Sequence, residues 1–158
     1  MLKQNEGKIK IVFKNLPLKI HDQAQPAALA ALAAQKQGKF WEYHDKLFAE
    51  KKINSASFDQ IASELNLDLK KFKADMQSTE SINHLRSDMV EAQQLGITST
   101  PSIFVNGRKL KERSTGGFQT LIDEEMEKLK KKNRSSILLI YLSTRQLFVL
   151  KSVELPVT

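Results

Sequence analysis

The order of apolar and polar positions predicts strands at both ends of a long helical region. Residues 8–14 alternate polar and apolar side chains before turning mostly apolar, which is typical of a strand. Residues 102–105 are again β-prone, and Asn106-Gly107 is a strong signal for a tight hairpin turn into a return strand at 108–110. The pattern therefore predicts a strand, several helices, a hairpin and a final helix.

Five helices are predicted between the first strand and the hairpin, each with apolar residues at the three- and four-residue spacing of an amphipathic helix. Most of them also carry residues that favour helix termini. In chain order they run from Asp22 through the alanine-rich 27–34 to Gly38, over 39–50, over 57–65, over 69–76 with Asp68 as cap, and from Ser78 or Thr79 to Gly96. The final helix is predicted at 118–129.

Composition is that of a globular domain, and the charge is concentrated at one end. The chain has 158 residues, of which 41% are hydrophobic and 27% charged, and a formal net charge of +7. Residues 1–127 contain 18 Lys and Arg against 17 Asp and Glu, whereas residues 128–158 contain 7 against 1. The domain itself is thus nearly neutral. The excess charge favours acidic partners or anionic surfaces only for the C-terminal tail.

The composition changes again after residue 132. Residues 135–142 and 146–150 are apolar and β-prone, and a short polar stretch joins them. The sequence therefore predicts a domain over 1–132 and a C-terminal appendage over 133–158 with the character of a β-hairpin.

The absence of cysteine excludes several kinds of chemistry. With no cysteine, the chain as given can form no disulfide, thiolate zinc site or iron–sulfur cluster, and it has no thiol nucleophile. No apolar signal-peptide region opens the sequence, and residues 137–142 are too short a run to span a membrane. We expect a cytoplasmic chain as written, without a transmembrane segment.

Histidines offer little support for a metal site. His84 and Asp88 lie four residues apart and His44 adjoins Asp45, but the chain lacks the His-x-x-x-His spacing of a zinc helix. We expect His44 to pack its ring at the edge of the core. No metal or cofactor is predicted.

Two further features have structural explanations. Gly116-Gly117 precedes a helix but lacks the Lys-Ser/Thr of a phosphate loop, so it is interpreted as a flexible turn. Aromatic residues cluster at helical spacing in one segment, and basic residues do not interleave with them, which favours core packing over nucleic-acid binding. These residues are Phe40, Trp41, Tyr43 and Phe48.

Three segments together resemble the DsbA-like thioredoxin-fold proteins. Residues 7–18, followed by His21 and Ala24, are similar to the second strand and following turn of that family. Residues 37–48 resemble its helical insertion, and residues 95–107 resemble its cis-proline loop and β-hairpin. The resemblance covers about residues 5–130. It implies an α/β, thioredoxin-like fold with a helical insertion over about 22–96.

The resemblance also implies a peptide-binding site, and the comparison shows that this sequence lacks the segment that carries the cysteines of the family. Pro101 is expected to be cis, and the backbone of Thr100 is expected to pair with an extended substrate peptide. The family carries a first strand and a Cys-x-x-Cys helix before the strand at 8–14, and neither is found here. We therefore expect an N-terminally incomplete, truncated and redox-inactive member with no catalytic residue, able to bind an extended polypeptide at Thr100 and Pro101. The family is usually exported to the cell envelope.

Two alternatives remain open at this point. The chain fits a non-catalytic interaction protein that binds acidic partners or anionic surfaces through its basic tail. It also fits a truncated or misread reading frame with a foreign tail.

The first strand of the family lies at the centre of the sheet, between the strands at 8–13 and 102–105. Without it, buried backbone groups would stay unpaired at about 1–3 kcal/mol each. Three arrangements could fill the gap: the tail segment 135–142, a strand swapped from a second copy in a homodimer, or collapse of the two neighbours onto each other. We favour the tail segment.

Overall fold

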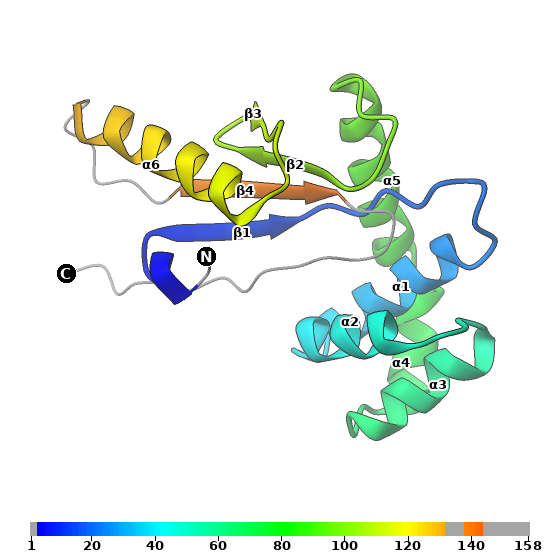
Figure 1. Ribbon diagram of the computed structural model, residues 1–158. Helices are drawn as coiled ribbons and strands as arrows, with labels where there is room; N and C mark the ends of the chain where they lie inside the picture. The colour runs from blue at the N-terminus through cyan, green and yellow to red at the C-terminus, as the bar shows by residue number, and fades with distance from the viewer. Residues whose placement is uncertain (1–2, 132–137, 144–158) are drawn as a thin grey trace. The chain divides into compact units, whose positions relative to one another are not determined.

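The computed structural model describes residues 3–131 and 138–143, and these fall into two compact units. The sheet unit combines residues 3–14, 102–131 and 138–142, and the helical unit contains residues 15–101. Figure 1 labels the helices and strands of both units, which are described separately below.

The sheet unit contains four strands in the order β1-β4-β2-β3. After a 3₁₀ turn at Lys3–Asn5, β1 (Ile9–Phe13) runs parallel to β4 (Leu138–Ser143), with Ile11 opposite Ile140. The hairpin of β2 (Ser102–Val105) and β3 (Arg108–Lys109) is antiparallel. Its turn is Asn106-Gly107, with φ of 48° and 80°, so the predicted hairpin is confirmed.

The tail supplies a central strand of this sheet. β4 lies between β1 and β2, where its backbone forms hydrogen bonds to both neighbours (Figure 1). The preference for the tail segment is therefore confirmed, and the alternative in which β1 and β2 collapse onto each other is wrong. The described part of the predicted appendage belongs to the sheet, since pairing there satisfies groups that burial would otherwise leave unpaired. The second predicted strand of the appendage, 146–150, lies outside the described residues.

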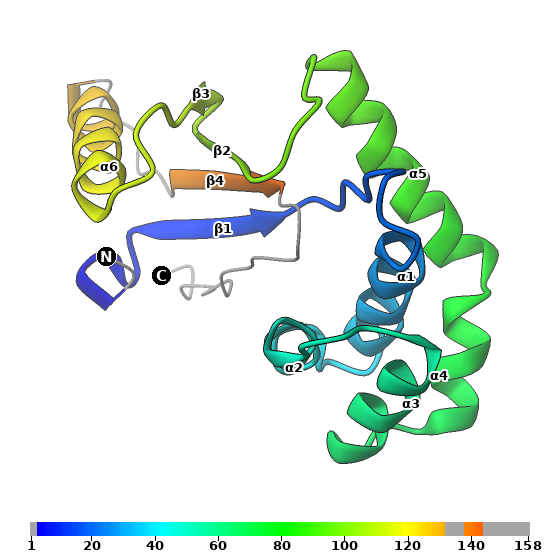
Figure 2. The same ribbon diagram turned by 45° about the vertical axis from the view of Figure 1, so that its right-hand side comes forward.

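Among the described residues, one helix packs against this sheet. α6 (Thr115–Lys131) contacts β2, and in Figure 2 it is seen almost end-on at the left of the strands. Its apolar stripe meets the apolar positions of β1 and β2 in a small core. The buried members of that core are Ile9, Ile11, Val105, Leu110, Leu121 and Ile122.

The start of α6 differs from the prediction, because the helix begins at Thr115 and includes both glycines in its first turn. The Ser114 hydroxyl accepts a hydrogen bond from the backbone N–H of Gly117 at 3.0 Å and so caps the helix. A Cβ atom added to Gly117 would collide with the carbonyl oxygen of Glu112. The interpretation as a flexible turn is therefore wrong, since close packing of the backbone requires glycine at Gly117.

The helical unit is built around an alanine-rich helix. α1 (Ala24–Gln35) contacts all four others, which are α2 (Phe40–Ala49), α3 (Ser55–Glu64), α4 (Leu69–Met76) and α5 (Thr79–Gln94). Small side chains let the neighbouring helices approach α1 closely, and larger apolar side chains from those neighbours fill the space between them. The largest are Tyr43, Leu47, Phe58, Ile61 and Phe72.

Three of the helix starts test the predicted caps. Asp68 accepts a hydrogen bond from the N–H of Lys71 at 2.9 Å at the start of α4, and Ser78 caps α5, so both predictions are confirmed. The predicted cap at Asp22 is wrong. The chain is still in a turn there, and the N-cap of α1 is Gln23, which makes no side-chain capping bond.

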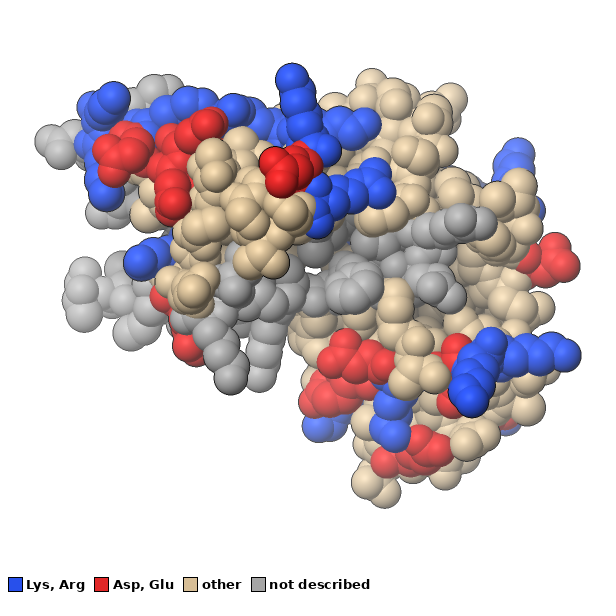
Figure 3. All heavy atoms as spheres, in the orientation of Figure 1, with Lys and Arg blue, Asp and Glu red and all other residues tan. Residues whose placement is uncertain are grey.

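Charges of both signs are interspersed on the molecular surface. On the face drawn in Figure 3, Lys and Arg side chains lie beside Asp and Glu in both units. Lys36, for example, forms ion pairs with Asp75 at 3.3 Å and with Glu80 at 2.7 Å. Helices of the described ranges are all too short or too polar to cross a bilayer.

Candidate functional site

The two residues singled out by the sequence lie at the bend between α5 and β2. Gly96, with φ of 65°, ends the helix, and the N–H of Ile97 returns to the carbonyl of Ala92 at 2.8 Å. The chain then turns through residues 98–101 into β2. The Thr100–Pro101 peptide bond is cis, the geometry that the family resemblance implies for this position.

The loop at this bend is partly open to solvent. Thr98 and Ser99 are exposed, whereas Thr100 and Pro101 are half-buried. The Oγ1 atom of Thr100 is buried, and nothing in the described part of the chain hydrogen-bonds to it. The exposed residues Thr98 and Ser99 carry hydroxyl groups that a ligand can reach, and with no cysteine in the sequence the loop offers no thiol nucleophile.

A buried polar pair joins α5 to the segment that follows β1. The backbone N–H and the side-chain amide of Asn15 both donate to Oδ2 of Asp88, each at 2.9 Å. The sequence pairs Asp88 only with His84, whose Nε2 lies 3.9 Å from Oδ2 and whose side chain is 48% exposed. The position of Asp88 between Leu85 and Ala92 on the buried face of α5 was the signal that it faces inward.

The remaining candidates are structural. His44 is 2% exposed, its Nδ1 lies 2.8 Å from Asp45, and its ring stacks on Phe48 with centroids 4.5 Å apart. Tyr43 is completely buried, and burial raises the pKa of its hydroxyl. Core packing of these side chains is thus confirmed. The part of the chain that the structure describes contains no group of three or more His, Asp or Glu residues arranged to hold a metal.

Comparison with known families identifies the fold. Residues 2–124 match a family model described as "Thioredoxin". The chain belongs to the thioredoxin family. The resemblance of the three sequence segments is confirmed at this level, and the α/β fold class with it.

Two relatives of this thioredoxin-family chain carry names related to oxidoreduction. It is 29% identical over 135 residues to a probable disulfide bond formation protein D of Bacillus anthracis, covering 78% of this chain and 61% of that protein. It is also similar to the crystal structure of a thioredoxin-like oxidoreductase from Silicibacter pomeroyi. That match has a TM-score of 0.60 and 29% identity, and it covers 69% of this chain and 64% of the other.

A third relative is a much longer protein. The chain is 37% identical over 103 residues to a Na(+)/H(+) antiporter NhaA 3 of Salinispora tropica, which covers 64% of this chain. The match spans only 16% of the antiporter, so the thioredoxin-family chain corresponds to a small part of it.

Proposed function

We propose that this thioredoxin-family protein is redox-inactive and binds extended polypeptides at the loop of residues 98–101. The observation that carries the proposal is that the bend at residues 98–101 is partly open to solvent, with Thr98 and Ser99 exposed and Thr100 half-buried just before β2. The absence of cysteine limits the site to binding, because disulfide exchange requires an attacking thiolate.

The sheet topology restricts how a polypeptide would bind. β2 already has β4 on one side and β3 on the other, so it offers no free edge for an added strand within the described sheet. A bound chain would instead pair with the main chain at Thr100, before β2 begins. Main-chain pairing over so short a stretch tolerates many sequences and gives weak binding.

An insulin-reduction assay tests the first half of the proposal. With dithiothreitol as reductant, we expect insulin to precipitate at the uncatalysed rate in the presence of the protein. Turnover above that rate would show that the chain carries redox chemistry of a kind that its sequence excludes.

Binding is tested separately, with a polypeptide that has no free thiol. Titration of carbamidomethylated insulin B chain into the ¹⁵N-labelled protein should shift the backbone amides of residues 98–100 and of Ser102. A matched peptide with N-methyl groups on its central residues should shift them much less, because it cannot donate main-chain hydrogen bonds. Equal shifts with both peptides, or none at these amides, would contradict the proposal.

The described residues give little support to the basic tail as the binding element. Lys128 and Lys130 at the end of α6 already form ion pairs with Glu125 and Glu127, at 2.6 and 2.7 Å. The salt dependence of peptide binding separates the two proposed binding modes, since tail-driven binding should weaken steeply with ionic strength.

Family resemblance supports a location in the cell envelope for this binding.

A further inference from the structure

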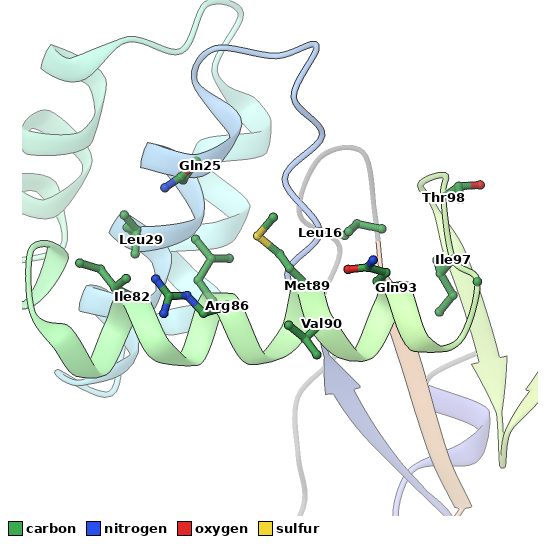
Figure 4. Close-up of a pocket in the computed structure, with 12 residues that line it drawn as sticks. Leu16, Gln25, Leu29, Ile82, Arg86, Met89, Val90, Gln93, Ile97 and Thr98 are labelled. Atoms are coloured by element: carbon green, nitrogen blue, oxygen red, sulfur yellow. The ribbon is translucent and has the colours of Figure 1, made fainter.

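A groove on the helical unit extends well beyond the loop proposed above, with which it shares Thr98. It has a volume of about 510 Å³ and lies between α1 and α5. Figure 4 shows Leu29 of α1 and Met89 of α5 along it, with Leu16 and Ile97 toward one end. The volume is within the range of ligand sites in proteins, and most of the lining is apolar.

One stripe of α5 borders the groove along three turns. Ile82, Arg86 and Val90 follow one another at four-residue spacing and so lie on the same side of the helix. Ile82 is 39% and Val90 45% exposed, although both are large apolar side chains. Exposed apolar residues aligned at helical spacing beside an apolar groove are typical of a surface that a partner covers.

Arg86 is the one charged residue in the lining of this groove. No carboxylate of the described residues pairs with it, whereas Lys36, Lys46 and Lys71 of the same unit all have acidic partners. A guanidinium between apolar side chains favours a ligand that brings a carboxylate.

We propose that this groove binds an amphipathic helix of a partner protein, which places a carboxylate on Arg86 and apolar side chains on either side of it. A helix satisfies its own backbone hydrogen bonds, whereas an extended chain would leave them unpaired against this apolar surface. Ile82 to Gln93 spans about 17 Å of α5, which matches about three turns of a bound helix. The inference does not depend on peptide binding at Thr100.

The test uses two synthetic helical peptides of about 16 residues with a fluorescent label. Both carry leucines at helical spacing along one side, and they differ only in a central Glu or Gln on that side. By fluorescence anisotropy with the full chain, we expect the Glu peptide to bind more tightly. Arg86→Gln should weaken the Glu peptide about tenfold and leave the Gln peptide unchanged. Val90→Asp should weaken both peptides.

Arg113→Gln is the matched control, because Arg113 is an exposed arginine outside the groove, and it should change neither affinity. Circular dichroism establishes that each variant is folded. Failure of both peptides to bind the wild type, or equal effects of Arg86→Gln on both, would overturn the proposal. It would also be overturned if sodium dodecanoate alone bound in an Arg86-dependent manner, or if sedimentation showed self-association that Val90→Asp abolished.

Discussion

A buried carboxylate, that of Asp88, connects two segments of the helical unit that are far apart in the sequence. Asp88 is 1% exposed, and one of its oxygens accepts two hydrogen bonds from Asn15. The pair ties the segment that follows β1 to the middle of α5. Because both donors are buried, their hydrogen bonds cannot be replaced by water when the carboxylate is removed.

Replacing Asp88 therefore has a large predicted cost. Asp88→Ala should lower the free energy of unfolding by about 2–3 kcal/mol, since it leaves two buried donors of Asn15 without an acceptor. Urea denaturation followed by circular dichroism measures this change. The control is Asp59→Ala, which removes an exposed ion pair with Lys73 and should cost less than about 1 kcal/mol. Equal losses for the two variants would contradict the assigned role.

The two glycines of α6 form a second test at this scale. A Cβ at Gly116 would meet only the Ser114 hydroxyl, at 3.7 Å, whereas one at Gly117 would collide with the backbone of Glu112. Gly116→Ala should raise stability by about 0.5–1 kcal/mol through helix propensity. Gly117→Ala should lower it by about 1–3 kcal/mol, because the backbone must shift. Thermal unfolding of the two variants should show melting temperatures that change in opposite directions.

At the scale of elements, charged groups join the hairpin to α6. The Arg108 guanidinium on β3 reaches Glu124 at 2.7 Å and Glu125 at 2.9 Å, and Lys128 reaches the same Glu125 at 2.6 Å. Burial alone would raise the pKa of Glu125, but the hydrogen bonds from Lys128 and Arg108 outweigh it and hold that pKa below its ordinary value. The carboxylate form is thus favoured by folding.

This pKa has a defined consequence for stability. A carboxyl with a lowered pKa stabilises the folded state above its unfolded pKa, and that contribution is lost as the pH falls through the folded pKa. The difference in unfolding free energy between wild type and Glu125→Gln should therefore be largest near neutral pH and shrink as the pH falls below about 4. Urea titrations at a series of pH values measure it.

Glu127→Gln provides the comparison for this pH series. It removes an exposed ion pair with Lys130 on the same helix, so its effect should be small at every pH. If the unfolding free energy of Glu127→Gln depended on pH as steeply as that of Glu125→Gln, the dependence would arise from the overall charge of the protein and not from the contact with Arg108.

At the scale of the whole molecule, a strand from the far end of the chain completes the sheet. β4 is separated from β1 by more than a hundred residues, yet it lies directly beside that strand and keeps β1 and β2 apart. Removing β4 would leave backbone groups of both neighbours unpaired, at about 1–3 kcal/mol each. The sheet unit thus depends on residues that composition alone sets apart from the domain.

Two truncations test this dependence. A chain ending at Lys131 lacks β4 and should lose the amide dispersion typical of a sheet in its NMR spectrum. A chain ending at Thr144 keeps β4 and should retain it. Retention of the sheet signals in the shorter chain would contradict the central position of β4.

Some residues of the site could be predicted from the sequence, whereas the roles of others depend on contacts between distant segments. The loop at Thr100 and Pro101 is predicted by the resemblance of residues 95–107 to the cis-proline loop of the family, a match that lies within one short segment of sequence. Asp88 was grouped with His84, its neighbour on the helix, since the approach of Asn15 from 73 residues away has no local signal. The sequence likewise does not single out Arg86, because its place in a groove depends on which helix packs beside α5.

Local spacing of residues was sufficient for the order of elements in residues 3–131, for the caps of α4 and α5 and for the exclusion of thiol chemistry, because periodicity, capping and residue identity act over a few positions. Tertiary contacts alone decided that β4 enters the centre of the sheet, that Gly117 must have no side chain and that Arg86 lies in an apolar groove. These features depend on backbone pairing and packing between distant segments, and the energies that select them appear only when those segments meet.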